Sequence, residues 1–142
     1  MSERSERISG RGLIRPIPDR DSAAWWARTA RHEFVLQGCD ACGTLRFPAR
    51  VYCHACRSRD WSWRPVEPTG TIESWIVTHQ PFTPGAATPY VVVMVRLTAA
   101  PDCVMYGNWY RDREPHPGEP VQASFTYVDE ELSLINWRPG SE

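Results

Sequence analysis

Two closely spaced cysteine pairs constrain this 142-residue chain more than any other feature of its sequence. Cys39 and Cys42 form the first pair, and Cys53 and Cys56 form the second, each with two residues between the cysteines. This spacing lets both thiolates of a tight turn point at one metal, and two such turns supply the tetrahedral set of sulfurs that suits zinc. Gly43 follows the first pair, where the turn needs a positive φ that costs glycine little. We therefore predict a zinc ribbon with one structural zinc ion.

Four protein ligands would close the coordination sphere of this metal. No position would remain for a water molecule or a substrate, so the zinc is expected to be structural rather than catalytic. Reduced, unligated thiols and a redox pair are the alternatives, and His54 could replace one of the sulfurs. The fifth cysteine, Cys103, lies in a predicted strand and is expected to be a small buried hydrophobic residue.

The residues needed for common catalytic chemistry are missing from the sequence. The chain contains no lysine, which excludes an imine formed by a lysine amine. It also lacks a G-x-S-x-G nucleophile motif and a phosphate-binding glycine loop, and its four histidines have no catalytic spacing. These absences favour a binding or accessory protein, with a free-standing small enzyme as an alternative.

The sequence divides into four parts. We expect a flexible lead over 1–18, a helix and the zinc ribbon over 19–66, a barrel over 67–138 and a short tail over 139–142. Thirteen prolines argue against long helices, so the helix is expected within 19–33. Trp26 and Ala30 would share one stripe of it, with Trp25 beside them. The proline-containing segment 61–70 is expected to be a rigid junction.

The second half of the chain is rich in β-branched and aromatic residues that alternate with polar ones. Five strands are expected, at 69–80, 90–99, 103–110, 120–129 and 132–138. Five consecutive antiparallel strands of this length favour a Greek-key OB-fold barrel, with an SH3-like barrel as the alternative. Gly107 is expected to mark a bulge or a tight bend. The predicted fold class is therefore mainly β, with an N-terminal helix, a rubredoxin-like zinc ribbon and a five-stranded OB-fold barrel.

Charge is unevenly distributed along the chain. Residues 1–64 carry twelve arginines and seven acidic residues, whereas residues 65–142 carry four arginines and ten acidic residues. An OB-fold module that binds single-stranded nucleic acid is an alternative function, but an acidic barrel would repel phosphates, so no nucleic acid is expected. No run of eighteen apolar residues and no secretory signal are visible, so we expect a cytoplasmic protein without a membrane span.

An ordered set of motifs resembles the "domain of unknown function 35" family of acyl-CoA-associated proteins. The set begins with a helix that carries a tryptophan and continues through both cysteine pairs into the barrel. The matching positions are Trp26, Cys39, Cys42, Gly43, Phe47, Pro48, Arg50, Cys53, Cys56, Thr69–Thr71, Pro89–Tyr90 and Gly118–Val121. The resemblance covers about residues 19–138.

This resemblance implies a non-catalytic accessory subunit. Members of the family typically assemble with thiolase-fold enzymes, among them thiolases, acyltransferases and the aldolases that shorten steroid side chains carried as CoA thioesters. The zinc ribbon and the barrel would help to bind or channel the acyl-CoA substrate, while the partner performs the reaction. The expected context is therefore steroid and lipid degradation by a heteromeric lyase or acyltransferase complex.

Charge and position suggest which residues would contact the CoA thioester. Arg46 and Arg50 could meet its phosphates, with Phe82 and Tyr90 of the proline-rich loop beside the acyl arm. The alternative is that both arginines brace the ribbon.

The partner interface is expected to use two other regions. Trp25 and Trp26 lie on the short helix, and the loop from Gln80 to Pro89 is rich in proline. Rigid aromatic surface of this kind is common at protein interfaces. The alternative is that both tryptophans are buried between the helix and the barrel.

Overall fold

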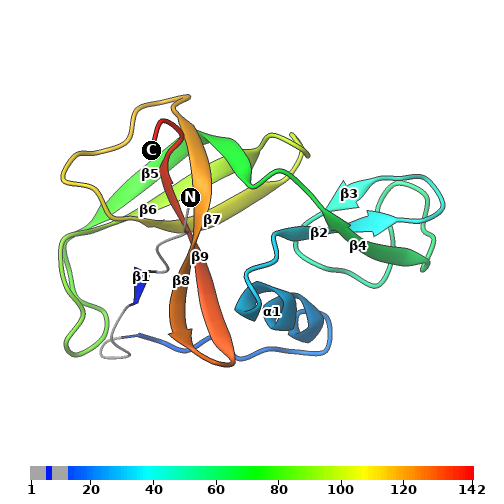
Figure 1. Cartoon of the computed structure of the whole chain (residues 1–142), viewed down its shortest axis with the longest axis horizontal. Coiled ribbons are helices and arrows are strands. Elements are labelled where there is room, and N and C mark those ends of the chain that lie inside the picture. Colours follow the sequence, from blue (N-terminus) through cyan, green and yellow to red (C-terminus); the bar gives the residue numbers. More distant parts are fainter. Residues whose placement is uncertain (1–5, 8–12) are drawn as a thin grey trace.

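The computed structural model describes residues 6–7 and 13–142 and consists of a small ribbon sheet beside a larger barrel (Figure 1). The predicted lead over 1–18 lies partly outside the described residues, and the predicted domain boundaries stay predictions. None of the helices in the described part of the chain is long and apolar enough to cross a membrane.

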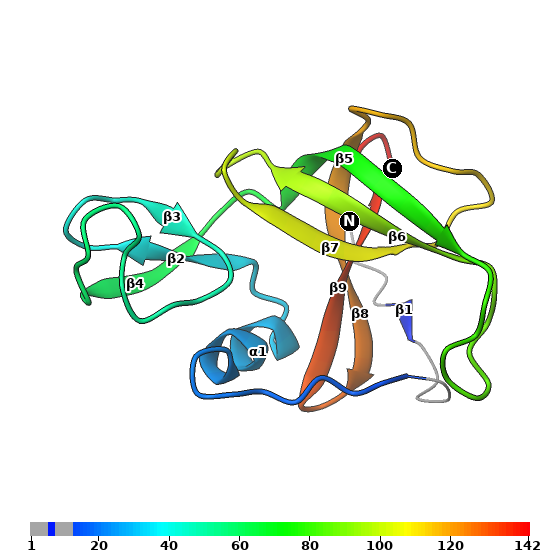
Figure 2. The same ribbon diagram turned by 180° about the vertical axis from the view of Figure 1, so that it is seen from behind.

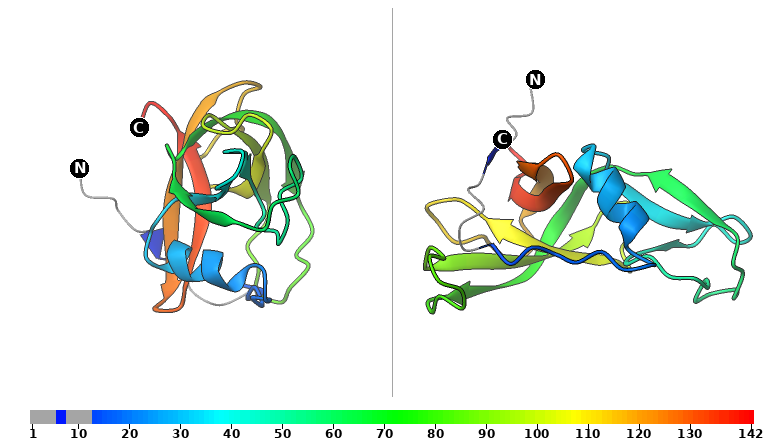
Figure 3. Two further views of the ribbon diagram at one scale, coloured as in Figure 1. Left: turned by 90° about the vertical axis from the view of Figure 1, so that its right-hand side faces the viewer. Right: turned by 90° about the horizontal axis from the view of Figure 1, so that it is seen from below.

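Helix α1 spans Ala23–Ala30 and is shorter than the segment in which it was expected. Asp19 holds the turn before it, since its Oδ1 accepts the amide of Ser22 at 2.8 Å. Trp25 and Thr29 form the buried row of the helix, which corrects the predicted row of Trp26 and Ala30. The helix lies against β9 (Leu132–Pro139) and β2 (Val35–Cys39) (Figure 3), which accounts for the burial of this row.

The ribbon is built on a three-stranded antiparallel sheet. Its order is β3 (Leu45–Arg46), β2 and then β4 (Trp61–Pro65), with β2 buried along its whole length. Residues 61–65 are therefore a strand of the ribbon and not the junction that the prolines predicted. The indole rings of Trp61 and Trp63, both on β4, pack edge to face with centroids 4.9 Å apart.

The barrel contains the five strands expected from the sequence. These are β5 (Thr69–Thr78), β6 (Tyr90–Leu97), β7 (Val104–Trp109), β8 (Pro120–Asp129) and β9. They pair in the order β8-β5-β6-β7-β9, and an additional β8–β9 pairing closes the barrel (Figure 2). The predicted fold class is thus confirmed, with one correction. The β7–β9 pair, joined at Trp109 and Trp137, is parallel rather than antiparallel. Strand β1 (Glu6–Arg7) extends the sheet parallel to β8.

One continuous apolar core runs from the helix through the ribbon into the barrel. Phe34, just before β2, packs edge to face on Trp137 of β9 with ring centroids 6.1 Å apart. Cys103 is buried as predicted, although it lies just before β7, and its sulfur is 3.9 Å from the carbonyl oxygen of Leu45 in the ribbon. The two units therefore share a packed seam.

Gly107 allows two strands of the barrel to approach closely. A Cβ atom at this position would lie 2.8 Å from the carbonyl oxygen of Ile135 and 2.8 Å from Cδ1 of Trp137. Strand β9 therefore crosses β7 where β7 has no side chain. The predicted bulge is not found at Gly107, since the register of β6 with β7 is continuous there; β5 has an irregularity between Ile72 and Ser74.

We predict that Gly107→Ala destabilises the barrel by about 2 kcal/mol, because the added methyl group would collide with backbone that cannot move aside easily. Urea unfolding of the zinc-loaded protein measures the change. Tyr106→Thr, at the exposed neighbouring position of the same strand, should change the free energy of unfolding by no more than about 0.5 kcal/mol. Equal effects of the two substitutions would contradict the close-approach argument.

Candidate functional site

The first cysteine turn is closed by two backbone hydrogen bonds. The amide of Cys39 donates to the carbonyl of Thr44 at 3.0 Å, and the amide of Gly43 donates to the carbonyl of Cys39 at 2.9 Å. Gly43 has φ of 78°, as predicted for the position after the pair. Both thiol groups of the turn are thereby aimed to the same side.

The second cysteine turn repeats this geometry without a glycine. The amide of Cys53 donates to the carbonyl of Ser58, and the amide of Arg57 donates to the carbonyl of Cys53, both at 2.9 Å. Arg57 takes the place of Gly43 and has φ of 66°, a conformation that is costly for a residue with a Cβ. This equivalence was not predicted, although the position of Arg57 directly after the second C-x-x-C pair matches that of Gly43 after the first.

The four sulfurs of the two turns come together as a metal site. All four Sγ atoms lie within 4.8 Å of one another, with 3.5 Å between Cys39 and Cys56 and 3.6 Å between Cys42 and Cys53. A Zn–S bond of about 2.3 Å in a tetrahedron requires sulfurs about 3.8 Å apart. The donor set and its spacing therefore fit zinc, with no contribution needed from His54.

Backbone amides prepare the sulfurs for a cation. The amide of Cys56 is the main cause that lowers the pKa of Cys53 to about 6. For Cys56 the amide of Ser58 lowers the pKa, but hydrogen bonds with Cys39 and the other two thiols outweigh it and raise the pKa to about 12. The last proton is therefore held tightly, because four adjacent thiolates repel one another. A divalent cation removes this repulsion.

Arg46, one of the residues predicted to contact CoA, is buried inside the ribbon. Its side chain is only 2% exposed, and its Nε donates to Oε1 of Gln37 at 2.7 Å. The same Gln37 oxygen accepts the amide of Arg50 at 2.7 Å. This arrangement favours the bracing role for Arg46. The side chain of Arg50 is exposed and has no ion pair among residues 13–142, so it stays available to an anion.

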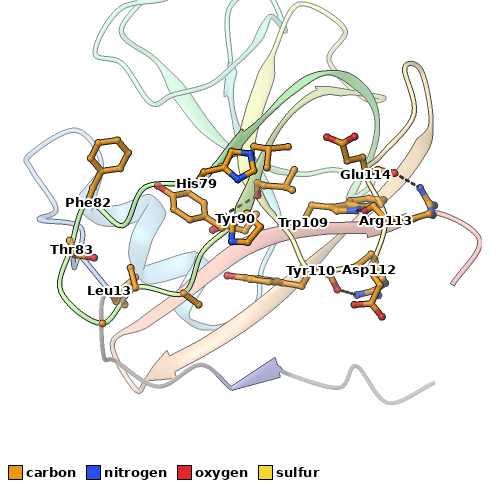
Figure 4. Close-up of a pocket in the computed structure, with 18 of the residues that line it drawn as sticks. Leu13, His79, Phe82, Thr83, Tyr90, Trp109, Tyr110, Asp112, Arg113 and Glu114 are labelled. Atoms are coloured by element: carbon orange, nitrogen blue, oxygen red, sulfur yellow. Dashed lines mark hydrogen bonds between the residues drawn. The ribbon is translucent and has the colours of Figure 1, made fainter.

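Phe82 and Tyr90, the other two predicted CoA contacts, lie far from these arginines. Figures 1 and 2 show the ribbon at one end of the molecule and the β5–β6 loop at the other. Both aromatic residues line a groove of about 1420 Å³ at the mouth of the barrel (Figure 4). The structure therefore brings Phe82 and Tyr90 together but does not bring them to Arg46 and Arg50.

Two further walls of this groove were not predicted from the sequence. One is the short segment of Leu13 and Ile14, and the other is the stretch from Asn108 to Glu114 that leaves β7. The signal that could have found the first wall is a pair of apolar residues in an otherwise polar lead.

The two tryptophans of α1 have different environments. Trp25 is buried, with its ring centroid 4.9 Å from that of Trp26 and 5.3 Å from that of Phe47. Trp26 is partly buried and packs against the core. Trp25 is therefore a core residue that joins the helix to the ribbon, and a partner interface on this helix, which stays a prediction, would have to use Trp26.

Comparison with known families matches both halves of the chain. Residues 26–62 match the model described as "ChsH2, rubredoxin-like zinc ribbon domain", and residues 63–126 match "ChsH2, C-terminal OB-fold domain". Together with the cluster of four sulfurs, the first match confirms the predicted structural zinc site.

Two curated proteins are similar over most of this chain. One is the "probable enoyl-CoA hydratase alpha subunit" of Thermomonospora curvata, 36% identical over 125 residues, which cover 88% of this chain and 39% of that protein. The other is the "3-oxo-4,17-pregnadiene-20-carboxyl-CoA hydratase alpha subunit" of Mycobacterium tuberculosis, 32% identical over 89% of this chain and 40% of that protein. The chain thus spans about two-fifths of the length of these relatives.

Solved structures with this fold include a chain of the "Ltp2-ChsH2(DUF35) aldolase". Its TM-score is 0.79 and its identity is 35%, over 88% of this chain and 98% of that one. A DUF35 protein of unknown function from Sulfolobus solfataricus has a TM-score of 0.51 at 14% identity, over 70% and 74% of the two chains, and shows a shared fold only.

We predict that the purified protein carries one zinc ion per chain and that Cys39→Ala loses both the metal and the folded ribbon. A site of this kind contributes on the order of 10–16 kcal/mol to folding at neutral pH. Elemental analysis and far-ultraviolet circular dichroism measure the two losses. Cys103→Ala is the matched control and should retain the zinc. A folded, metal-free wild-type protein would contradict the prediction.

Proposed function

This chain belongs to the family of ChsH2-type zinc-ribbon and OB-fold proteins, and from that premise we propose that it is a non-catalytic accessory subunit of an acyl-CoA aldolase. Its partner would be an Ltp2-type subunit, for which the sequence resemblance implies a thiolase fold. The partner would perform carbon–carbon cleavage, and the present chain would complete or order the substrate site.

One comparison carries this proposal. The relative in the Ltp2-ChsH2(DUF35) aldolase is 35% identical to this chain, and the match covers 98% of that relative. A chain that corresponds to nearly the whole of that relative supports the same kind of assembly here. The hydratase alpha subunits are a weaker guide to activity, since this chain corresponds to about two-fifths of each.

The chemistry of the chain supports an accessory role. Four sulfur ligands close the zinc sphere, so the metal cannot activate water. Without lysine, the chain cannot form a lysine imine with a carbonyl substrate. The reactive groups for cleavage of a β-hydroxyacyl-CoA would therefore come from the partner, which would also supply the general base.

The names of two relatives support a substrate class for the proposed complex. The Mycobacterium tuberculosis relative is named for a steroid carboxyl-CoA, and the Thermomonospora curvata relative for an enoyl-CoA. Both names support a CoA thioester for this chain's complex, and the name of the Mycobacterium tuberculosis relative supports a steroid side chain as its acyl group. Arg50 is the exposed cation of the predicted CoA contacts and could meet a phosphate in the assembled complex.

We expect this chain to show no aldolase activity alone and to co-elute with an Ltp2-type subunit when the two are co-expressed. Activity toward a β-hydroxyacyl-CoA should appear only in the fraction that contains both proteins. Size-exclusion chromatography and a retro-aldol assay on each fraction measure this. Turnover by the isolated chain would refute the proposal, as would separate elution of the two proteins.

We also predict that Arg50→Glu raises the KM of the complex for its CoA thioester by about tenfold, because one charge-assisted contact with a phosphate is replaced by repulsion. The value of kcat should change little. Arg20→Glu, a reversal at an exposed position outside the ribbon, is the control. An unchanged KM with zinc content intact would show that CoA does not contact Arg50.

A further inference from the structure

The groove at the barrel mouth collects exposed apolar side chains. Ile14 and Phe82 are 73% and 70% exposed, and Tyr110, on the wall formed by residues 108–114, is also exposed. Ile17, three residues beyond Ile14, is exposed as well. Exposed apolar residues that gather on one face commonly mark an interaction surface, whereas single ones need no explanation.

Ion pairs hold two walls of the groove in place. Arg15 follows Ile14, and its guanidinium donates to both carboxylate oxygens of Asp129, at 2.7 and 3.2 Å. On the opposite wall, Arg113 donates to both carboxylate oxygens of Glu119 at 3.0 and 2.6 Å. The indole of Trp109 donates to the carbonyl of Arg113 at 2.7 Å (Figure 4). The groove is therefore formed before any partner arrives, which limits the entropy lost on binding.

The charges around the groove do not favour an anionic ligand. Arg113 is paired with Glu119, and the guanidinium of Arg111 donates to the carboxylate of Glu142. Asp112 and Glu114 line the same wall and add negative charge. A CoA nucleotide, with its phosphates, would meet arginines that are already neutralised. The groove therefore suits an apolar occupant that carries no phosphate or acidic group.

The size and shape of the groove favour a polypeptide over a small ligand. Its volume of about 1420 Å³ exceeds the range of about 300–1,000 Å³ that is usual for small-molecule pockets. A protein surface can cover the floor and the exposed side chains of Ile14 and Phe82 together.

We propose that this groove is the docking site for an apolar segment of the aldolase partner subunit that lacks acidic side chains. This inference rests on the proposed function and specifies the partner contact. Ile14 and Phe82 would be the anchors, one from each side of the groove. Phe82 would then contact the partner protein rather than the acyl arm.

The test measures the dissociation constant between this chain and the Ltp2-type subunit from the same organism by biolayer interferometry. Ile14→Asp and Phe82→Asp should each weaken the complex about tenfold or more, as is typical for loss of an interface anchor. Phe82→Leu, which keeps an apolar side chain at this position, should retain most of the wild-type affinity. Ile76→Asp is the matched control. Ile76 is 62% exposed on β5, next to the groove residue Val77, but does not itself line the groove. Its substitution should change the dissociation constant by no more than about twofold. Zinc content and thermal unfolding verify that each variant is folded.

Several results would overturn the proposal. Unchanged affinity for both aspartate variants would exclude the groove as the docking site, and a raised KM for the CoA thioester in those variants would assign it to the substrate. Equal weakening by Ile76→Asp would place the interface elsewhere on the barrel. Self-association of the isolated chain that both aspartate variants abolish would assign the groove to a second copy. If the wild-type chain forms no complex, the proposed function fails and the docking site with it.

Discussion

Repulsion among four neighbouring thiolates is the constraint on which the ribbon depends. The two turns place the sulfurs of Cys39, Cys42, Cys53 and Cys56 close enough that they cannot all carry charge without a cation between them. A sheet of three short strands buries too little apolar surface to hold that arrangement by itself. Zinc therefore supplies what the small sheet lacks, and the rest of the ribbon, including the buried Gln37–Arg46 contact, is arranged around it.

The fold could be predicted largely because its determinants are local. The C-x-x-C spacing defines the metal turns, and alternating β-branched residues define the five barrel strands to within two residues at every end. Predictions were wrong where contacts between distant segments determine the local structure. Residues 61–65 form a strand despite Pro65, because Pro65 is the last residue at the edge of the sheet. The buried row of α1 contains Trp25 because that side chain meets Phe47, which is distant in sequence.

The candidate site also has one part that is determined by local sequence and one part that depends on contacts between distant segments. Its metal centre is encoded in eighteen consecutive residues, 39–56, and could be identified from them. The groove draws on segments near residues 13, 82 and 110, and only the folded barrel brings these together. Grouping Arg46 and Arg50 with Phe82 and Tyr90 assumed a proximity that the chain does not have, since the ribbon and the β5–β6 loop lie at opposite ends of the molecule. Proximity between distant segments is what composition and spacing cannot supply.

The seam formed by Phe34 on Trp137 and by Cys103 beside Leu45 has a thermodynamic consequence. Because the ribbon and the barrel share one core, the loss of either exposes apolar surface of the other, so the stability of each unit depends on the other. A ligand that binds only the folded state stabilises all that folds with it, in proportion to the logarithm of its free concentration. The barrel contacts no metal, yet the fraction of it that is folded depends on the concentration of free zinc. The groove, which lies far from the cysteines, depends on that concentration too.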